Sequence, residues 1–221
     1  MIEAEKLKKS YSEKVVLDIS SIKIRQSQIV SICGPSGAGK TTLLSILGTL
    51  VKADNYKEQS LKILNQDVNK MSLNHLAKFR NKHLGFIFQF HELLDEFNVI
   101  ENIIIPGLIA NKEKKMLIKK ATEILKILNI VDLKYNNPKN ISGGEKQRVA
   151  VARSLINSPS IIFADEPSGN LDAKNADELH KLFFRLRDEF GQTFVIVTHN
   201  EKLSKISDKV LKLVDGKIQA R

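Results

Sequence analysis

Apolar residues along the chain follow two kinds of spacing, and the first kind predicts strands. Continuous apolar runs, typical of strands covered on both faces, occupy residues 28–33, 85–88, 160–164 and 193–198. Residues 61–64 form a weaker candidate of the same kind. Residues 2–7 and 15–24 predict two further strands on either side of a turn at residues 10–14.

The second kind of spacing is helical. It runs from residue 99 to residue 157, with breaks at 136–138 and 142–144, and it returns in the amphipathic stretch 173–190. Strands that alternate with helices predict an α/β fold with a mostly parallel sheet covered by helices. The helix-rich middle, about residues 78–157, is predicted to be inserted between the two halves of that sheet.

Length and composition agree with one α/β domain over residues 1–221, because the chain can bury a sizeable core but is short for two equal domains. The single cysteine, Cys33, excludes a disulfide within the chain and indicates a reducing compartment. We expect it to pack as a small buried apolar residue. The longest uncharged apolar segment, residues 102–111, is too short to cross a bilayer, and no secretion signal is evident.

The chain is strongly basic, with a formal net charge of +10. Such an excess can favour a nucleotide, a nucleic acid or a membrane surface as partner. Many of the lysines are scattered, and the densest basic run, residues 112–120, has helical spacing. We interpret this run as the solvated face of an amphipathic helix. Because aromatic residues are not interleaved with the basic ones, we expect no nucleic-acid partner.

The most specific chemical signal is a glycine-rich loop between a predicted strand and a predicted helix. Residues 34–41 match G-x-x-x-x-G-K-[ST], whose backbone N–H groups turn inward onto a phosphate chain. Lys40 is expected to reach the β- and γ-phosphates, and the Thr41 hydroxyl to ligate Mg²⁺. The predicted nucleotide-binding residues of this loop are Gly34, Pro35, Ser36, Gly37, Ala38, Gly39, Lys40, Thr41 and Thr42.

A second signal is an apolar strand that ends in two adjacent carboxylates. Residues 161–166 read Ile-Ile-Phe-Ala-Asp-Glu. One carboxylate at such a strand end can hold the Mg²⁺ shell, and the next can polarise a water molecule that attacks the γ-phosphorus. We therefore assign Asp165 to the metal ion, beside Thr41, and Glu166 to the water.

A third signal is another loop of small residues that opens a helix. It consists of Ser142, Gly143, Gly144 and Glu145, preceded by Ile141. A helix start of this kind can bind an anion. Two such helix starts in a chain with one nucleotide to bind predict that the second serves the phosphate of a neighbouring molecule.

With these three motifs in this order, the chain resembles the ATP-binding-cassette ATPases over essentially its whole length. The resemblance implies a P-loop NTPase fold with a RecA-like α/β core, an N-terminal antiparallel β subdomain and an inserted α-helical subdomain. It also implies that ATP and Mg²⁺ are the cofactors and that hydrolysis takes place in a homodimer. Ile141 and Glu145 stand where Leu and Gln are commoner in the family's signature motif, and neither departure removes the hydroxyl or the amides that the family uses.

The resemblance assigns four further residues. Gln89 resembles the Q-loop glutamine, which approaches Mg²⁺ and the attacking water, and His199 resembles the switch histidine at the γ-phosphate. Asp172 resembles the D-loop aspartate at the dimer seam, and Tyr11 resembles the aromatic residue that stacks on adenine. The implied catalytic set is Lys40, Gln89, Glu166 and His199, and the implied metal set is Thr41, Gln89 and Asp165.

Residues 88–102 and 164–172 narrow the resemblance to the branch that contains the LolD, MacB and FtsE ATPases. The first stretch and the Ser-Gly-Gly-Glu form favour the lipoprotein-releasing LolD type. This type implies transmembrane permease subunits (LolC/LolE-like) as partners and a peripheral place on the cytoplasmic face of the inner membrane. The alternatives are a MacB-type exporter, an FtsE-like regulatory ATPase, and a soluble ATPase acting on ribosomes or DNA. Three departures are Ser168 for Thr, the absence of a Gly-Glu turn at 25–28, and the absence of a Ser-Gly turn at 52–60.

Overall fold

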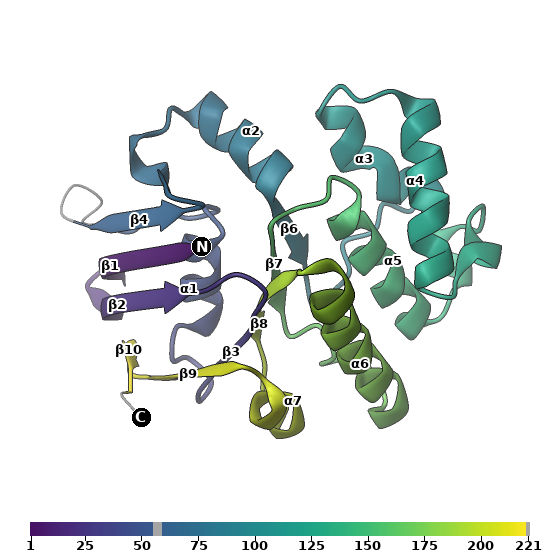
Figure 1. Ribbon diagram of the computed structural model, residues 1–221. Coiled ribbons are helices and arrows are strands. Elements are labelled where there is room, and N and C mark those ends of the chain that lie inside the picture. The colour runs from purple at the N-terminus through teal and green to yellow at the C-terminus, as the bar shows by residue number, and fades with distance from the viewer. Residues whose placement is uncertain (55–58, 220–221) are drawn as a thin grey trace.

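The computed structural model describes residues 1–54 and 59–219, and its centre is a six-stranded sheet (Figure 1). The spatial order is β10-β9-β3-β8-β7-β6, with β10 antiparallel to β9 and every other neighbouring pair parallel. The strands are β3 (Ile29–Cys33), β6 (Leu84–Ile87), β7 (Ile161–Asp165), β8 (Thr193–Val197), β9 (Lys209–Val214) and β10 (Lys217–Ile218). The predicted mostly parallel sheet is therefore confirmed, while β9 and β10 were not predicted.

The apolar strands of this sheet are covered on both faces. In β7, Ile161 and Phe163 belong to one hydrophobic core, and Ile162 and Ala164 belong to the other. Successive side chains of a strand point to opposite faces, so a strand between two cores must be apolar at every position. This requirement accounts for the continuous apolar runs in the sequence.

A second sheet, antiparallel throughout, packs over the first core (Figure 1). Its order is β2-β1-β4-β5, and its strands are β1 (Ile2–Tyr11), β2 (Lys14–Ile24), β4 (Ser60–Ile63) and β5 (Gln66–Asp67). The expected N-terminal antiparallel subdomain is present. β1 extends to Tyr11 and β2 begins at Lys14, so the turn between them is shorter than the predicted 10–14. The pairing shifts register where Lys9 faces Leu17 and Ser10 faces Val15, which leaves Val16 as a bulge.

Two segments, residues 25–28 and 52–60, lack the turns that are usual in the family, and the structure describes only the first of them completely. At the turn without Gly-Glu, Ser27 has a left-handed φ of 53°, and its hydroxyl donates to the carbonyl of Gly191 at 3.0 Å. The Gln28 side chain also accepts a hydrogen bond from the Arg25 N–H at 3.0 Å. Side-chain hydrogen bonds thus hold a conformation that glycine adopts more easily. In the segment 52–60, residues 55–58 lie outside the described residues.

Seven α-helices occur in the described residues: α1 (Lys40–Leu47), α2 (Leu73–His83), α3 (Val99–Ile109), α4 (Lys114–Ile127), α5 (Gly143–Leu155), α6 (Ala173–Phe190) and α7 (Glu201–Ile206). Short 3₁₀ turns occupy Val68–Lys70, Val131–Leu133 and Pro138–Asn140. The helical spacing expected for 99–157 and 173–190 is confirmed. No helix in residues 1–54 and 59–219 is both long and apolar enough to span a bilayer.

Helices α3, α4 and α5 stand on the side of the central sheet away from β1 and β2 (Figure 1). They form the second core together with α6. The range 78–157 begins within α2 and includes β6, which pairs with β7 in the central sheet. The inserted helices α3, α4 and α5 therefore begin after β6 and end before β7.

Candidate nucleotide-binding site

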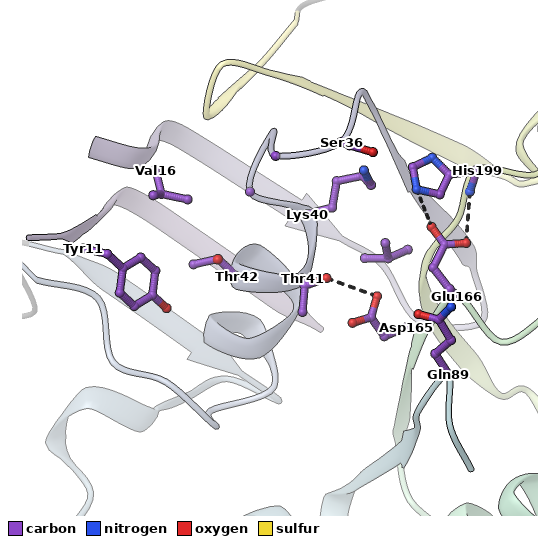
Figure 2. A pocket seen from close by; sticks show the side chains of 13 residues that line it. Tyr11, Val16, Ser36, Lys40, Thr41, Thr42, Gln89, Asp165, Glu166 and His199 are labelled. Atoms are coloured by element: carbon purple, nitrogen blue, oxygen red, sulfur yellow. Dashed lines mark hydrogen bonds and ion pairs between the residues drawn. The ribbon is translucent and has the colours of Figure 1, made fainter. Parts of the chain in front are cut away.

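The predicted catalytic and metal-binding residues, and most of the predicted nucleotide-binding residues, line one cleft at the carboxyl ends of the parallel strands (Figure 2). The P-loop follows β3, Glu166 follows β7 and His199 comes shortly after β8, and these three strands are neighbours in the order β3-β8-β7. In open parallel sheets, ligands bind outside these strand ends. The cleft has a volume of about 440 Å³ and is lined by Tyr11, Val16, Ser36, Gly37, Gly39, Lys40, Thr41, Thr42, Gln89, Asp165, Glu166, Val197 and His199.

The P-loop curls around the ammonium group of its own lysine. Lys40 is buried, and its Nζ donates to the carbonyls of Gly34 at 3.0 Å and Pro35 at 2.9 Å. Glycine is required at two points of the curve. A Cβ on Gly34 would lie 2.0 Å from the carbonyl oxygen of Leu213, and Gly39 has a φ of 94°. Gly34, Pro35 and Ala38 shape the loop without lining the cleft.

Thr41 and Asp165 form the part of the cleft that suits a metal ion. The Thr41 hydroxyl donates to Oδ1 of Asp165 at 3.3 Å (Figure 2). In the described residues, no group of three or more His, Cys, Asp and Glu side chains could hold a metal ion. Mg²⁺ commonly takes one or two protein oxygens and completes its shell with substrate phosphates and water. This oxygen pair therefore fits Mg²⁺ bound together with a nucleotide, and Gln89 lines the same cleft.

Glu166 and His199 face each other across the strand ends. His199 Nε2 lies 3.1 Å from Oε1 of Glu166, and the backbone N–H of His199 donates to Oε2 at 3.2 Å. Figure 2 shows both contacts as dashed lines. Glu166 has a left-handed φ of 45°, and its N–H donates to the carbonyl of Val197 at 3.0 Å. A strained backbone at a carboxylate held by two contacts is typical of a functional position.

Burial changes the proton affinity of the acidic pair. It raises the pKa of Asp165, and the Thr41 hydrogen bond and the positive charge of Lys40 oppose the rise. Burial also raises the pKa of Glu166, and the neighbouring Asp165 adds to this rise while His199 and Lys40 oppose it. A carboxylate whose pKa is shifted towards neutrality is better suited to accept a proton.

Tyr11 and Gln89 lie at opposite ends of the cleft (Figure 2). Tyr11 is 50% exposed, with Lys9 Nζ 5.2 Å from the ring centroid. The backbone carbonyl of Gln89 accepts a hydrogen bond from Asn170 Nδ2 at 3.2 Å. The structure thus places both predicted residues on the cleft.

Two lining residues were not predicted, Val16 and Val197. Val16 reaches the cleft through the β2 bulge, and its carbonyl would meet a Cβ on Gly39 at 2.8 Å. Val197 is the last residue of β8, within a run whose apolar character is explained by burial alone. Neither position carries a signal that would separate it from its neighbours in the sequence.

The second small-residue loop does not contribute to this cleft. None of Ser142, Gly143, Gly144 and Glu145 lines it, and Ser142 and Gly143 are exposed. Ser142 caps α5, and the N–H and hydroxyl of Ser142 both donate to Glu145 Oε2 at 2.7 Å. These bonds lower the pKa of Glu145, so the residue that replaces the commoner Gln stays ionised. The loop is an exposed helix start that does not line the cleft of its own chain.

Asp172 has a comparable local role. It caps α6, with Oδ1 accepting from the Asn175 N–H at 2.9 Å and Oδ2 from Asn175 Nδ2 at 2.6 Å. These hydrogen bonds lower the pKa of Asp172. Asn175 also borders the second loop, because a Cβ on Gly144 would lie 3.2 Å from its Oδ1. Asp172 and the second loop therefore share one exposed region.

Cys33, expected to be buried and apolar, is only partly buried. It ends β3, directly before the P-loop, and its Sγ lies 2.9 Å from the hydroxyl oxygen of Ser204. The side chain does not line the nucleotide cleft.

The chain is similar to known proteins in both sequence and fold. The family model described as ABC transporter matches residues 17–169. The chain is 51% identical over 218 residues to the lipoprotein-releasing system ATP-binding protein LolD of Bacteroides fragilis, covering 99% of this chain and 100% of that protein. It is 52% identical over 216 residues to the LolD of Porphyromonas gingivalis, with coverage of 98% and 97%.

Among solved structures, the chain resembles a dimeric ATP-binding cassette, MJ0796, in a post-hydrolysis state bound to ADP and Pi. The TM-score is 0.90 and the sequence identity 32%, with 100% of this chain and 97% of the other covered. A cassette from Clostridium perfringens, cbiO1, gives a TM-score of 0.88 at 26% identity, with 99% and 86% covered.

The raised pKa of Asp165 makes a prediction about stability. The folded protein holds this proton more tightly than the unfolded chain, so ionisation of Asp165 lowers the free energy of unfolding as pH rises above the ordinary value of 3.8. Asp165→Asn removes that ionisation. We expect it to raise the Tm of the nucleotide-free protein at pH 7.5 by a few degrees, with a gain that shrinks towards pH 4.5.

Thermal unfolding from pH 8 to pH 4.5 in the presence of a chelator measures this effect. Asp132→Asn, at an exposed position of a 3₁₀ turn, is the matched control, and its Tm should follow the wild type. A Tm for Asp165→Asn below the wild type at pH 7.5, or a gain that does not change with pH, would contradict the account.

Proposed function

The chain belongs to the ABC transporter family of ATP-binding cassettes, and on this premise we propose that it is the ATP-hydrolysing subunit of a complex that releases lipoproteins from the inner membrane. One observation carries the catalytic part, namely the convergence of Lys40, Thr41, Asp165, Glu166 and His199 in one cleft. The choice of lipoprotein release is supported by two relatives, each about half identical over nearly their full length, that carry this name.

Binding of ATP is assigned to the P-loop and the residues beside it. The backbone N–H groups of the loop and the start of α1 surround the phosphates, and the Lys40 ammonium neutralises the charge of the β- and γ-phosphates. Tyr11, at the far end of the cleft, stacks on the adenine ring. When bound by Thr41, Asp165 and Gln89, Mg²⁺ supplies positive charge against the phosphate oxygens.

Hydrolysis is assigned to Glu166 and His199. The Glu166 carboxylate orients the attacking water and accepts its proton, a role helped by its raised pKa. His199, held against Glu166 by the 3.1 Å contact, is placed to hold the γ-phosphate. Gln89, on the same cleft, is assigned to approach the same water. Catalysis in this arrangement depends on positioning and on fixed charge.

The second loop completes the site of another copy. Because Ser142 and Gly144 lie outside the cleft of their own chain, they are available to the γ-phosphate bound by a second subunit. Two subunits arranged head to tail then enclose two ATP molecules, with Asp172 at the seam. The dimeric state of a 32% identical cassette supports this arrangement.

The surface beside Gln89 is assigned to membrane subunits. The segment between β6 and α3 exposes three large apolar side chains: Phe90 is 72% exposed, Leu94 44% and Phe97 41%. Apolar side chains gathered on a surface are typical of a protein–protein contact. Their closeness in sequence to Gln89 would let a permease pair of the LolC/LolE type sense the nucleotide at the cytoplasmic face of the inner membrane.

A first prediction concerns Glu166→Gln. The amide keeps the size of the side chain but cannot accept a proton from water, so ATP should still bind while turnover falls by roughly a hundredfold or more. Phosphate release measures the turnover, and size-exclusion chromatography with ATP measures dimer formation. Glu123→Gln, on the exposed side of α4, should match the wild type. Near wild-type hydrolysis by Glu166→Gln would refute its assignment.

A second prediction concerns the membrane partner. A tagged chain isolated from detergent-solubilised membranes should bring down a four-span protein with a large periplasmic domain, and the reconstituted complex should release lipoproteins only with hydrolysable ATP. Phe90→Ser, which replaces the most exposed of the three apolar side chains, should weaken the association without lowering basal ATPase activity. A partner that activates wall hydrolases, or retention of lipoproteins during ATP turnover, would contradict lipoprotein release.

A further inference from the structure

The loop that carries Gln89 into the cleft is held by side chains from several elements. Asn170 donates to the Gln89 carbonyl at 3.2 Å, and Asn137 donates to the Asp95 carbonyl at 2.8 Å. Asn102, fully buried in α3, donates to the carbonyls of Leu94, Phe97 and Asn98. The loop is therefore a fixed segment whose shape depends on its anchors.

The tightest part of the loop lies two residues beyond Gln89. His91 has a φ of 62° and Glu92 a φ of 49°, so two successive residues with side chains adopt the left-handed conformation. Such residues persist only where the surroundings hold them. A local glycine could adopt this turn freely, but the sequence has none here. The contacts of the turn must therefore offset the steric cost of the left-handed conformation.

Arg153, from α5, supplies those contacts. Its Nη2 donates to the His91 carbonyl at 2.6 Å, and its Nη1 donates to the Glu92 carbonyl. The charge of the Glu92 carboxylate also attracts the Arg153 guanidinium. Burial lowers the pKa of its guanidinium, as it does that of the neighbouring His91. The planar guanidinium can donate to two adjacent carbonyls in a fixed geometry, which the ammonium group of lysine cannot reproduce.

We propose that Arg153 is a positioning residue that holds the turn at His91 and Glu92 and thereby couples helix α5 to Gln89. The same helix begins at the second loop, where Ser142 is its cap. A shift of α5, when Ser142 engages the nucleotide of another copy, is then passed through Arg153 to the loop that places Gln89. The inference rests on the proposed function, because the role of Gln89 belongs to it.

Kinetics of Arg153→Met and Arg153→Lys provide the first test. Loss of the guanidinium should lower kcat for ATP hydrolysis by roughly ten- to a hundredfold while KM changes less than about twofold, because misplacing Gln89 affects the reacting water more than ATP binding. Arg153→Lys keeps one charged donor and should lie between Arg153→Met and the wild type. An unchanged kcat in Arg153→Met, or a loss expressed only in KM, would overturn the proposal.

Arg148→Met is the matched control. Arg148 lies on the same helix, donates to the Leu128 carbonyl at 3.2 Å and pairs with Glu178 at 2.6 Å. Neither of these partners belongs to the loop that carries Gln89. Its replacement removes a comparable set of contacts from α5. If the two Met variants lower kcat equally, the loss in Arg153→Met comes from a less stable helix α5, and the proposal is wrong.

A double variant tests the left-handed turn directly. In Glu92→Gly one of the two left-handed residues adopts its φ without steric cost, so the demand on Arg153 is reduced. Arg153→Met combined with Glu92→Gly should therefore regain much of the kcat that Arg153→Met alone loses. A double variant no faster than Arg153→Met would contradict the role of the strained turn.

Hydrogen exchange gives a readout that needs no turnover. Amides of residues 89–97 should lose protection in Arg153→Met and keep it in Arg148→Met, with ATP absent. This result separates failure of the inference from failure of the proposed ATPase role. Protection that stays unchanged in Arg153→Met would overturn the inference even if hydrolysis were impaired, and wild-type inactivity would count against the proposed function alone.

Discussion

The parallel alignment of β3, β8 and β7 is the constraint on which the site depends. The register sets Ile32 beside Val197 and Val197 beside Asp165, so the three strands end at the same level. The segments that leave them continue this alignment: Glu166 N–H donates to the Val197 carbonyl, and Thr198 N–H donates to the Ile32 carbonyl. A slip of one residue would move every side chain of a strand to the other face and separate Glu166 from His199.

Fixed charge of both signs meets at these strand ends. The buried Lys40 ammonium lies near two carboxylates whose pKa values burial raises, and neither acid forms an ion pair with it among the described residues. Such an arrangement is costly for the folded chain alone and becomes favourable when phosphates and a cation enter between the charges. The free energy that this arrangement costs the free protein is regained when the nucleotide and the cation bind. The same fixed charges stabilise the charge that develops during hydrolysis.

Much of this site could be predicted because its residues are dictated by local chemistry. The phosphate loop, the strand-end acids and the capped second loop each need particular residue types in sequence order, and the structure places them where those motifs indicate. The remainder depends on tertiary pairing. Val16 reaches the cleft through a bulge that pairing creates, and β9 is a short strand with lysines at its first and fourth positions. Arg153 acts on carbonyls 62 and 61 positions earlier in the chain. No periodicity or motif encodes such contacts.

In the proposed dimer each nucleotide site is built from two copies of the chain, and subunit mixing tests this arrangement most directly. Lys40→Met and Ser142→Arg should each abolish ATP hydrolysis as homodimers. A mixed dimer retains one site with both residues intact, so an equal mixture is expected to regain about a quarter of wild-type activity if subunits pair at random. A mixture no more active than either variant alone would contradict a site shared between copies.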